Sequence, residues 1–249
     1  MSELAGLTAV VTGSSSGIGR AIAIELGRAG AAVLVHARRS RAAADSVAAT
    51  LRDLGVPSTV VLADLAIANA PEQLIEEAWA WRGQVDVWVN NAGADTLTGE
   101  AAEWSFARKL EALWQVDVRA TIVLARGAGA RMSAAGRGVI LNMGWDRAER
   151  GMAGDSGELF AASKGAVIAF TRSLARSLAP QVRVNCLAPG WVKTAWAERA
   201  SEYWQQRAVA ESLLGRWGTP EDVARVARFL ASPAAESITG QIVAINGGS

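Results

Sequence analysis

The sequence is poor in the residues that build disulfides and metal sites. Its 249 residues include one cysteine, Cys186, and one histidine, His36. A single cysteine excludes an internal disulfide framework and a cysteine metal cluster. Cys186 stands in the apolar run VRVNCLAPG, where we expect a buried and inert thiol. His36 has no second histidine or cysteine nearby, so the sequence predicts no metal site.

An excess of charge and long hydrophobic runs are also missing. The chain has 25 Lys+Arg against 24 Asp+Glu, a net charge of +1, which gives no general attraction to nucleic acid or to an anionic membrane. No apolar run is long enough to cross a bilayer, and the first residues, MSELAGLTAVVTG, lack the basic and long apolar regions of a secretory signal. We therefore expect no nucleic-acid or membrane partner, a small-molecule substrate, and a cytoplasmic location.

From residue 7 onward, short apolar segments alternate with longer amphipathic ones, and no linker rich in proline or serine interrupts them. We expect strands at 7–13, 31–37, 58–65, 85–93, 138–143, 182–190 and 241–248. We expect helices at 19–30, 41–55, 71–83, 103–132, 158–179 and from 221, with an irregular Trp-bearing insert before the last. Strands that alternate with helices pair in parallel through right-handed crossovers. The sequence thus predicts one α/β domain over residues 1–249, with a doubly wound parallel sheet.

A glycine-rich segment, TGSSSGIGRA at residues 12–21, follows the first expected strand and opens a helix. Gly13, Gly17 and Gly19 permit a tight turn and let backbone N–H groups approach a pyrophosphate, which the helix N-terminus also favours. Glycines serve plain turns as well, but the strand–turn–helix context of a dinucleotide site is met here. We therefore predict a dinucleotide-binding turn.

Further motifs follow in order: LADL at 62–65, NNAG at 90–93, a helical lysine at 164, PGWVKT at 189–194 and ITGQIVAINGG at 238–248. With TGxxxGIG, this series resembles the short-chain dehydrogenase/reductase family over nearly the whole chain. The resemblance implies a Rossmann-type fold, an NAD(P)-dependent oxidoreductase and a homo-oligomer, either tetramer or dimer. By the same resemblance, the cofactor phosphates would be bound by Gly13, Ser15, Ser16, Ile18 and Gly19, and the adenine by Asp64 and Leu65. The ribose and nicotinamide path would be lined by Asn91, Ala92 and Gly93, and Lys164 would bind the ribose hydroxyls. The nicotinamide would lie by Pro189, Gly190, Val192 and Thr194, with Val192 and Thr194 at its carboxamide.

The end of the second expected strand, AAVLVHARRS, indicates which dinucleotide is bound. An acidic residue there would accept hydrogen bonds from the ribose 2′-hydroxyl of NAD, but Ala37 occupies the position. Arg38 and Arg39 follow, and guanidinium groups bind the additional 2′-phosphate of NADP. The alternative is that the two arginines are a solvated loop pair. We predict NADP(H) as the cofactor.

The motifs at the reaction centre depart from the family pattern. Members that reduce carbonyls use a tyrosine four residues before the lysine, a serine after the preceding strand and an asparagine on an earlier helix. Lys164 is retained, but Phe160 takes the tyrosine position, Trp145 or the adjacent Gly144 the serine position, and Asp117 the asparagine position. Three simultaneous departures indicate a coordinated change rather than one inactivating substitution. The candidate catalytic residues are Lys164, Asp146, Asp117, Trp145 and Phe160.

The segment from Trp145 to Phe160 should border the substrate cleft, and it carries the carboxylates of Asp146, Glu149, Asp155 and Glu158. Trp191, Trp196 and Trp204 fall in the insert that covers the substrate in this family, so aromatic walls for a bulky substrate are expected. The simpler interpretations are that the acidic loop is solvated surface and that tryptophans pack. Trp104 and Trp114 in particular are expected to pack or to form subunit contacts.

Three functions fit these residues. The first is an NADPH-dependent reductase of C=N bonds, because an iminium arrives cationic, leaves as a neutral amine and needs no tyrosine-like acid. The second is a carbonyl reductase in which a carboxylate such as Asp146, or Lys164 through water, replaces the tyrosine. The third is a catalytically silent NADP(H)-binding protein that senses the dinucleotide or scaffolds an oligomer.

Overall fold

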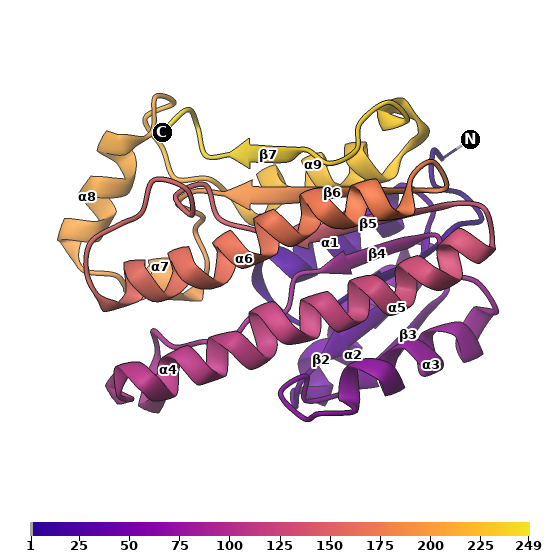
Figure 1. Ribbon diagram of the computed structural model, residues 1–249, viewed down its shortest axis with the longest axis horizontal. Helices are drawn as coiled ribbons and strands as arrows, with labels where there is room; N and C mark the ends of the chain where they lie inside the picture. Colours follow the sequence, from indigo (N-terminus) through magenta and orange to yellow (C-terminus); the bar gives the residue numbers. More distant parts are fainter. Residues whose placement is uncertain (1) are drawn as a thin grey trace.

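The computed structural model describes residues 2–249, apart from the side chains of Trp196 and Arg199. Within these residues, seven strands form one parallel sheet in the order β3-β2-β1-β4-β5-β6-β7 (Figure 1). The strands are β1 (Thr8–Val11), β2 (Ala32–Ala37), β3 (Ser58–Leu62), β4 (Val87–Asn90), β5 (Gly138–Met143), β6 (Val182–Pro189) and β7 (Ile242–Ile245). The chain reverses its direction of progress between β1 and β4, as in a doubly wound sheet. The predicted fold class is confirmed.

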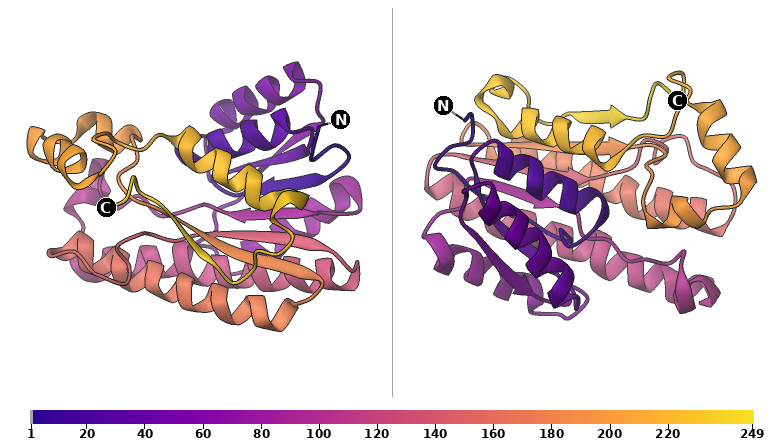
Figure 2. Two further views of the ribbon diagram at one scale, coloured as in Figure 1. Left: turned by 90° about the horizontal axis from the view of Figure 1, so that it is seen from above. Right: turned by 180° about the vertical axis from the view of Figure 1, so that it is seen from behind.

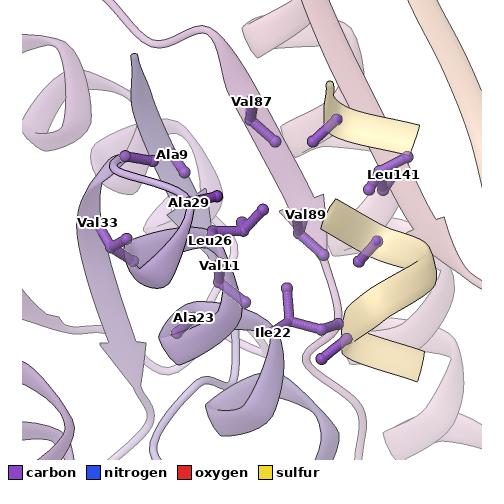
Figure 3. Close-up of a cluster of buried hydrophobic side chains, with 14 of the residues drawn as sticks. Ala9, Val11, Ile22, Ala23, Leu26, Ala29, Val33, Val87, Val89 and Leu141 are labelled. Atoms are coloured by element: carbon purple, nitrogen blue, oxygen red, sulfur yellow. The ribbon is translucent and has the colours of Figure 1, made fainter. Parts of the chain in front are cut away.

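Helices cover both faces of the sheet (Figure 2). One face carries α1 (Gly17–Arg28), α2 (Arg41–Asp53) and α9 (Pro220–Ala231), and the other carries α3 (Ala70–Arg82), α5 (Thr121–Ala134) and α6 (Asp155–Leu178). The inner strands are apolar on both sides because each side is buried under helices, whereas the edge strands β3 and β7 are only partly buried. Ile22 and Leu26 of α1, for example, pack against the strand residues Val11 and Val89 (Figure 3).

The structure also gives observations on Cys186, on metal sites and on membrane-spanning helices. Cys186 is a buried free thiol, and burial raises its pKa to about 12, so it is unreactive as expected. Among the described residues, no group of three or more His, Cys, Asp or Glu side chains is arranged to hold a metal ion. Within residues 2–249, no helix combines the length and the apolarity needed to cross a membrane.

The expected helix over 103–132 is a composite. A short 3-10 segment, η1 (Gly99–Glu103), precedes α4 (Phe106–Leu113), which continues through the π-helical segment η2 (Trp114–Ala120) into α5. A π-helical turn holds one more residue than an α-helical turn, and such turns are frequent at functional sites. Asp117 lies in this wider segment and is buried.

The insert before the last helix differs from the irregular segment that the sequence predicted. It contains α7 (Ala195–Arg199) and α8 (Glu202–Glu211), and α8 lies beyond the carboxyl ends of β6 and β7 (Figure 1). A last 3-10 turn, η3 (Pro233–Ala235), leads toward β7. The insert therefore stands at the edge of the sheet where ligands bind in doubly wound folds.

Candidate active site

The glycine-rich turn lies at the carboxyl end of β1, tightly packed against the segment that follows β4. A Cβ atom on Gly13 would lie 2.9 Å from the Cα of Ala92, and one on Gly19 would lie 2.4 Å from the carbonyl oxygen of Gly13. A Cβ on Gly17 would meet only Thr194 Cγ2, at 3.9 Å. The turn thus excludes side chains where it packs and leaves space at the N-terminus of α1, so its residues fit a dinucleotide pyrophosphate.

Thr12 and Asn91 join this turn to the NNAG segment. The Thr12 hydroxyl accepts hydrogen bonds from the backbone N–H groups of Asn91 (2.9 Å) and Ala92 (3.0 Å). The Asn91 side-chain amide donates to the carbonyls of Thr12 (2.9 Å) and Gly13 (3.2 Å). The two predicted cofactor segments are therefore one rigid unit.

His36, in β2, hydrogen-bonds the same glycine-rich turn through its imidazole ring. The backbone N–H of Gly13 donates to His36 Nδ1 at 3.0 Å, while Nε2 lies 3.0 Å from the carbonyl oxygen of Ala63 and donates to it. Both ring nitrogens are therefore used by a neutral imidazole. Burial lowers the pKa of His36 to about 4, although the Ala63 hydrogen bond and the charge of Asp64 act in the opposite direction.

The two arginines predicted to contact a 2′-phosphate are exposed just beyond β2. Ala37 is buried, and Arg39 reaches toward Asp64 with 4.0 Å between Nη2 and Oδ2. The backbone hydrogen bond from Ser14 to His36, at 2.9 Å, holds the end of β2 against the glycine-rich turn. Leu65, at the expected adenine position, is buried. The predicted adenosine-side residues are thus brought together.

Lys164 and Asp117 form a buried ion pair. Lys164 Nζ lies 2.8 Å from Asp117 Oδ2, with side-chain exposures of 10% and 2%. The other Asp117 oxygen accepts the backbone N–H of Ala94 at 2.8 Å, so three chain segments meet at this carboxylate. Lys164 is the only basic side chain among the described residues that line the adjoining cavity. Because Asp117 pairs with it, the two side chains together add no net charge there.

This cavity has a volume of about 540 Å³ and is mainly apolar. Trp145 and Phe160 meet edge to face, with 6.3 Å between ring centroids, and form one wall. The other described lining residues are Ile18, Leu97, Met143, Gly144, Met152, Ala153, Gly154, Asp155, Ser156, Gly157, Lys164, Pro189, Gly190, Trp191, Val192, Thr194 and Trp204. Trp191 and Trp204 thus stand where the sequence placed them, whereas the Trp196 side chain lies outside the described residues.

The sequence predicted that the carboxylates of the segment from Trp145 to Phe160 border the cleft, but not all of them do. Asp146 was expected at the cleft, but its Oδ2 accepts hydrogen bonds from Asn246 Nδ2 and Ser249 Oγ, both at 3.1 Å, and it does not line the cavity. The reason is backbone alternation: residues 144 and 146 donate to carbonyls of β6, so Trp145 and Asp146 face opposite sides.

The remaining three carboxylates also separate. Glu149 pairs with Arg172 at 2.9 Å on the surface, and Glu158 is exposed away from the described cavity lining. Asp155, at the start of α6, is exposed and is the one acidic residue among the described lining residues. The candidate carboxylate at the cavity is therefore Asp155 rather than Asp146.

Sequence reasoning missed several lining residues. Leu97, Met143 and Met152 are apolar residues in loops or at a strand end, where no local pattern distinguishes a cavity wall from a packed core. Ser156 follows Asp155 at the first turn of α6, and the preceding Gly154, with φ of 92°, was the available signal for the helix start.

Comparison with known proteins places this geometry in a family. A family model described as Enoyl-(Acyl carrier protein) reductase matches residues 13–249. A short chain dehydrogenase/reductase of Aspergillus aculeatus is 33% identical, over 99% of this chain and 96% of that protein. The 3-oxoacyl-[acyl-carrier-protein] reductase of Aquifex aeolicus is also 33% identical, over 99% and 98%.

Solved structures agree. A gluconate 5-dehydrogenase from Burkholderia cenocepacia, in complex with NADP and tartrate, has a TM-score of 0.88 and 30% identity over 99% of this chain and 96% of that one. The chain therefore belongs to the short-chain dehydrogenase/reductase family of NAD(P)-dependent oxidoreductases.

Proposed function

We propose that the protein is an NADPH-dependent reductase of the C=N bond of a bulky, ring-bearing iminium. The charge balance of the cavity carries this proposal. Lys164 is neutralised by Asp117, so Asp155 is left as the uncompensated charge among the described lining residues of a cavity that Trp145 and Phe160 also line. A negative net charge with aromatic walls favours a cation.

The cofactor assignment is supported by Arg38 and Arg39 beside the glycine-rich turn, and by relatives that bind NADP. NADPH supplies a hydride to the electrophilic carbon. The chain's part is to hold the phosphates at the N-terminus of α1, to place Lys164 at the ribose and to exclude water with the Trp145–Phe160 wall.

The proton balance favours C=N over C=O in this site. Hydride addition to an iminium gives a neutral amine, so no proton has to be delivered in that step. Hydride addition to a ketone gives an alkoxide, which needs a proton or a hydrogen-bond donor. Phe160 supplies neither, and Trp145 and Asp117 at the serine and asparagine positions complete the atypical set proposed for this site.

Carbonyl reduction is the second candidate, because relatives such as the 3-oxoacyl-[acyl-carrier-protein] reductases reduce ketones. The proton would then come from Lys164 through water, or from a lining carboxylate. Asp146 hydrogen-bonds Asn246 and Ser249, so Asp155 is the better-placed carboxylate. A catalytically silent NADP(H)-binding protein is the third candidate, which the same assays distinguish.

The test follows NADPH absorbance with 2-phenyl-1-pyrroline, which takes up a proton from solvent to become the iminium, and with 2-tetralone as the ketone. We expect turnover of the imine with little turnover of the ketone. Asp155→Asn should raise the imine KM about two- to fivefold with a smaller change in kcat, because an exposed carboxylate contributes up to about 1 kcal/mol, mainly to cation binding. Glu158→Gln, three residues further along α6, is the matched control. Ketone turnover whose kcat falls in Asp155→Asn would support the second candidate, and NADPH binding without any turnover the third.

We also propose that the protein is a cytoplasmic homo-oligomer, tetramer or dimer. Phe106, Leu110 and Trp114 recur every four residues on α4 and its continuation, with exposures of 42%, 37% and 46%. Side chains four apart share a helix face, and a contiguous exposed apolar face on a helix indicates a protein interface.

A further inference from the structure

A cluster of charged and aromatic side chains lies behind the cavity wall, centred on Glu211 at the end of α8. The Glu211 carboxylate accepts hydrogen bonds from Arg147 Nη2 (2.6 Å), Trp191 Nε1 (2.7 Å) and Arg207 Nε (2.8 Å). Arg147 belongs to the segment after β5, Trp191 to the segment after β6, and Arg207 to α8 itself. One carboxylate thus ties together three segments that border the cavity.

The cluster holds two tryptophans of the cavity wall. Trp191 and Trp204 lie with 5.5 Å between ring centroids, and both line the cavity. The Arg207 guanidinium lies 5.2 Å from the centroid of Trp204, and the Arg147 guanidinium lies 5.5 Å from that of Trp191. Each arginine therefore contacts both the carboxylate and an aromatic face of the wall.

The ion pairs of the cluster are better shielded than ordinary surface pairs. The side chains of Arg147 and Glu211 are 16% and 28% exposed. Burial raises the pKa of Glu211, but the hydrogen bonds from Arg207 and Trp191 and the charge of Arg147 outweigh this, so the pKa is lowered overall. A charged carboxylate that receives three donors is a stronger anchor than an isolated exposed pair.

We propose that Glu211 is a positioning residue that fixes the Trp191–Trp204 wall and so determines the affinity of the cavity for ring-bearing substrates. Glu211, Arg147 and Arg207 do not belong to the described cavity lining, so they act through the two tryptophans. The kind of substrate rests on the proposed function, but the positioning itself depends only on the contacts of the cluster.

The first test is amide hydrogen exchange of the NADP⁺-loaded protein in wild type and Glu211→Gln. Loss of the carboxylate charge should raise exchange by at least about tenfold over residues 191–195 and 202–211, because charge-assisted hydrogen bonds then weaken. Glu202→Gln on the same helix is the matched control and should leave exchange unchanged, since Glu202 accepts a hydrogen bond from Gln206 Nε2 at 2.9 Å within α8. Equal exchange in wild type and Glu211→Gln would overturn the proposal.

The second test separates positioning of the wall from mere anchoring of α8. Calorimetry measures the binding of 2-tetralone to the NADP⁺-loaded protein, a complex that cannot react and so needs no turnover. Glu211→Gln should raise the 2-tetralone Kd roughly tenfold, with the NADP⁺ Kd changed less than about twofold. Arg147→Gln should act similarly, and the double variant should add little, since both remove one interaction.

The two readouts also distinguish this proposal from the proposed function. Raised exchange with an unchanged 2-tetralone Kd would overturn the role in substrate affinity. Failure of wild type to turn over any substrate would count against the reductase proposal, while raised exchange and weaker 2-tetralone binding in Glu211→Gln would still support the positioning role.

Discussion

At the residue scale, the buried contact between Lys164 and Asp117 offsets the one basic charge of the described cavity lining, which leaves the charge of Asp155. Lys164 Nζ and Asp117 Oδ2 lie 2.8 Å apart, so the pair adds no net charge to the cavity that Lys164 and Phe160 line. A lone ammonium there would oppose a cationic substrate, whereas the pair tolerates one. The identity of residue 117 therefore matters as much for the chemistry as that of residue 160.

The first residue-scale prediction concerns the choice of dinucleotide. Arg38→Asp should raise the NADPH KM at least about tenfold and leave the NADH KM unchanged or lower it, because the carboxylate repels a 2′-phosphate and accepts a hydrogen bond from a 2′-hydroxyl. Initial-rate kinetics with both dinucleotides measure this. Arg52→Asp, at the far end of α2, is the control. An equal effect on both KM values would contradict the assignment of Arg38 to the 2′-phosphate.

The second residue-scale prediction concerns His36 and pH. The unfolded chain takes up a proton below a pKa of 6.5, but the folded protein does so only below about 4. The stabilisation by neutral His36 is therefore complete above pH 6.5 and is lost as the pH falls toward 4, by up to about 3 kcal/mol. Urea unfolding of wild type and His36→Gln across this range measures it. The same loss in both proteins would contradict the assignment.

At the element scale, the glycine-rich turn packs closely against the first residues of α1, and this packing affects both stability and cofactor binding. Gly19→Ala should destabilise the fold by about 1–3 kcal/mol and weaken NADPH binding, because the new methyl group would meet the Gly13 carbonyl at 2.4 Å. Gly165→Ala on α6 is the control, since its methyl group would meet only the Ala148 carbonyl at 4.0 Å. Thermal unfolding and NADPH titration provide the measurements. A Gly19→Ala variant as stable as Gly165→Ala would show that the turn is loose.

Elements were predictable from the sequence where the local pattern determines them. The strand GVILNM has the limits that were predicted, and the other strands lie within their predicted ranges, because short apolar runs between turn residues mark strands. The π-helical segment and α8 were not predictable. They depend on contacts with distant residues, such as Lys164 for Asp117, and Arg147 and Trp191 for Glu211.

The same limit applied to the candidate site. The motifs predicted that Lys164, Phe160 and Trp145 meet at one cavity, because the carboxyl ends of parallel strands share one edge of the sheet. They did not predict that Asp146 faces Asn246, since the direction of a loop side chain depends on how its backbone pairs with β6.

The exposed face of Phe106, Leu110 and Trp114 gives a prediction at the scale of the whole molecule. Leu110→Glu with Trp114→Glu should lower the molar mass measured by light scattering after size exclusion, because two charges would be buried at a subunit interface. Leu54→Glu, at an exposed position after α2, should leave the mass unchanged. A wild-type protein that is already monomeric would contradict the proposed assembly.

The proposed function depends on the absence of a phenolic hydroxyl that could act as a general acid at residue 160. The most direct measurement therefore compares imine and ketone reduction in wild type and Phe160→Tyr. We predict that kcat/KM of wild type for 2-phenyl-1-pyrroline exceeds that for 2-tetralone at least about tenfold. We also predict that Phe160→Tyr raises ketone relative to imine reduction by roughly 10²-fold, the scale of one positioned general acid. Wild type that reduces 2-tetralone as well as the imine, with no change in Phe160→Tyr, would contradict it.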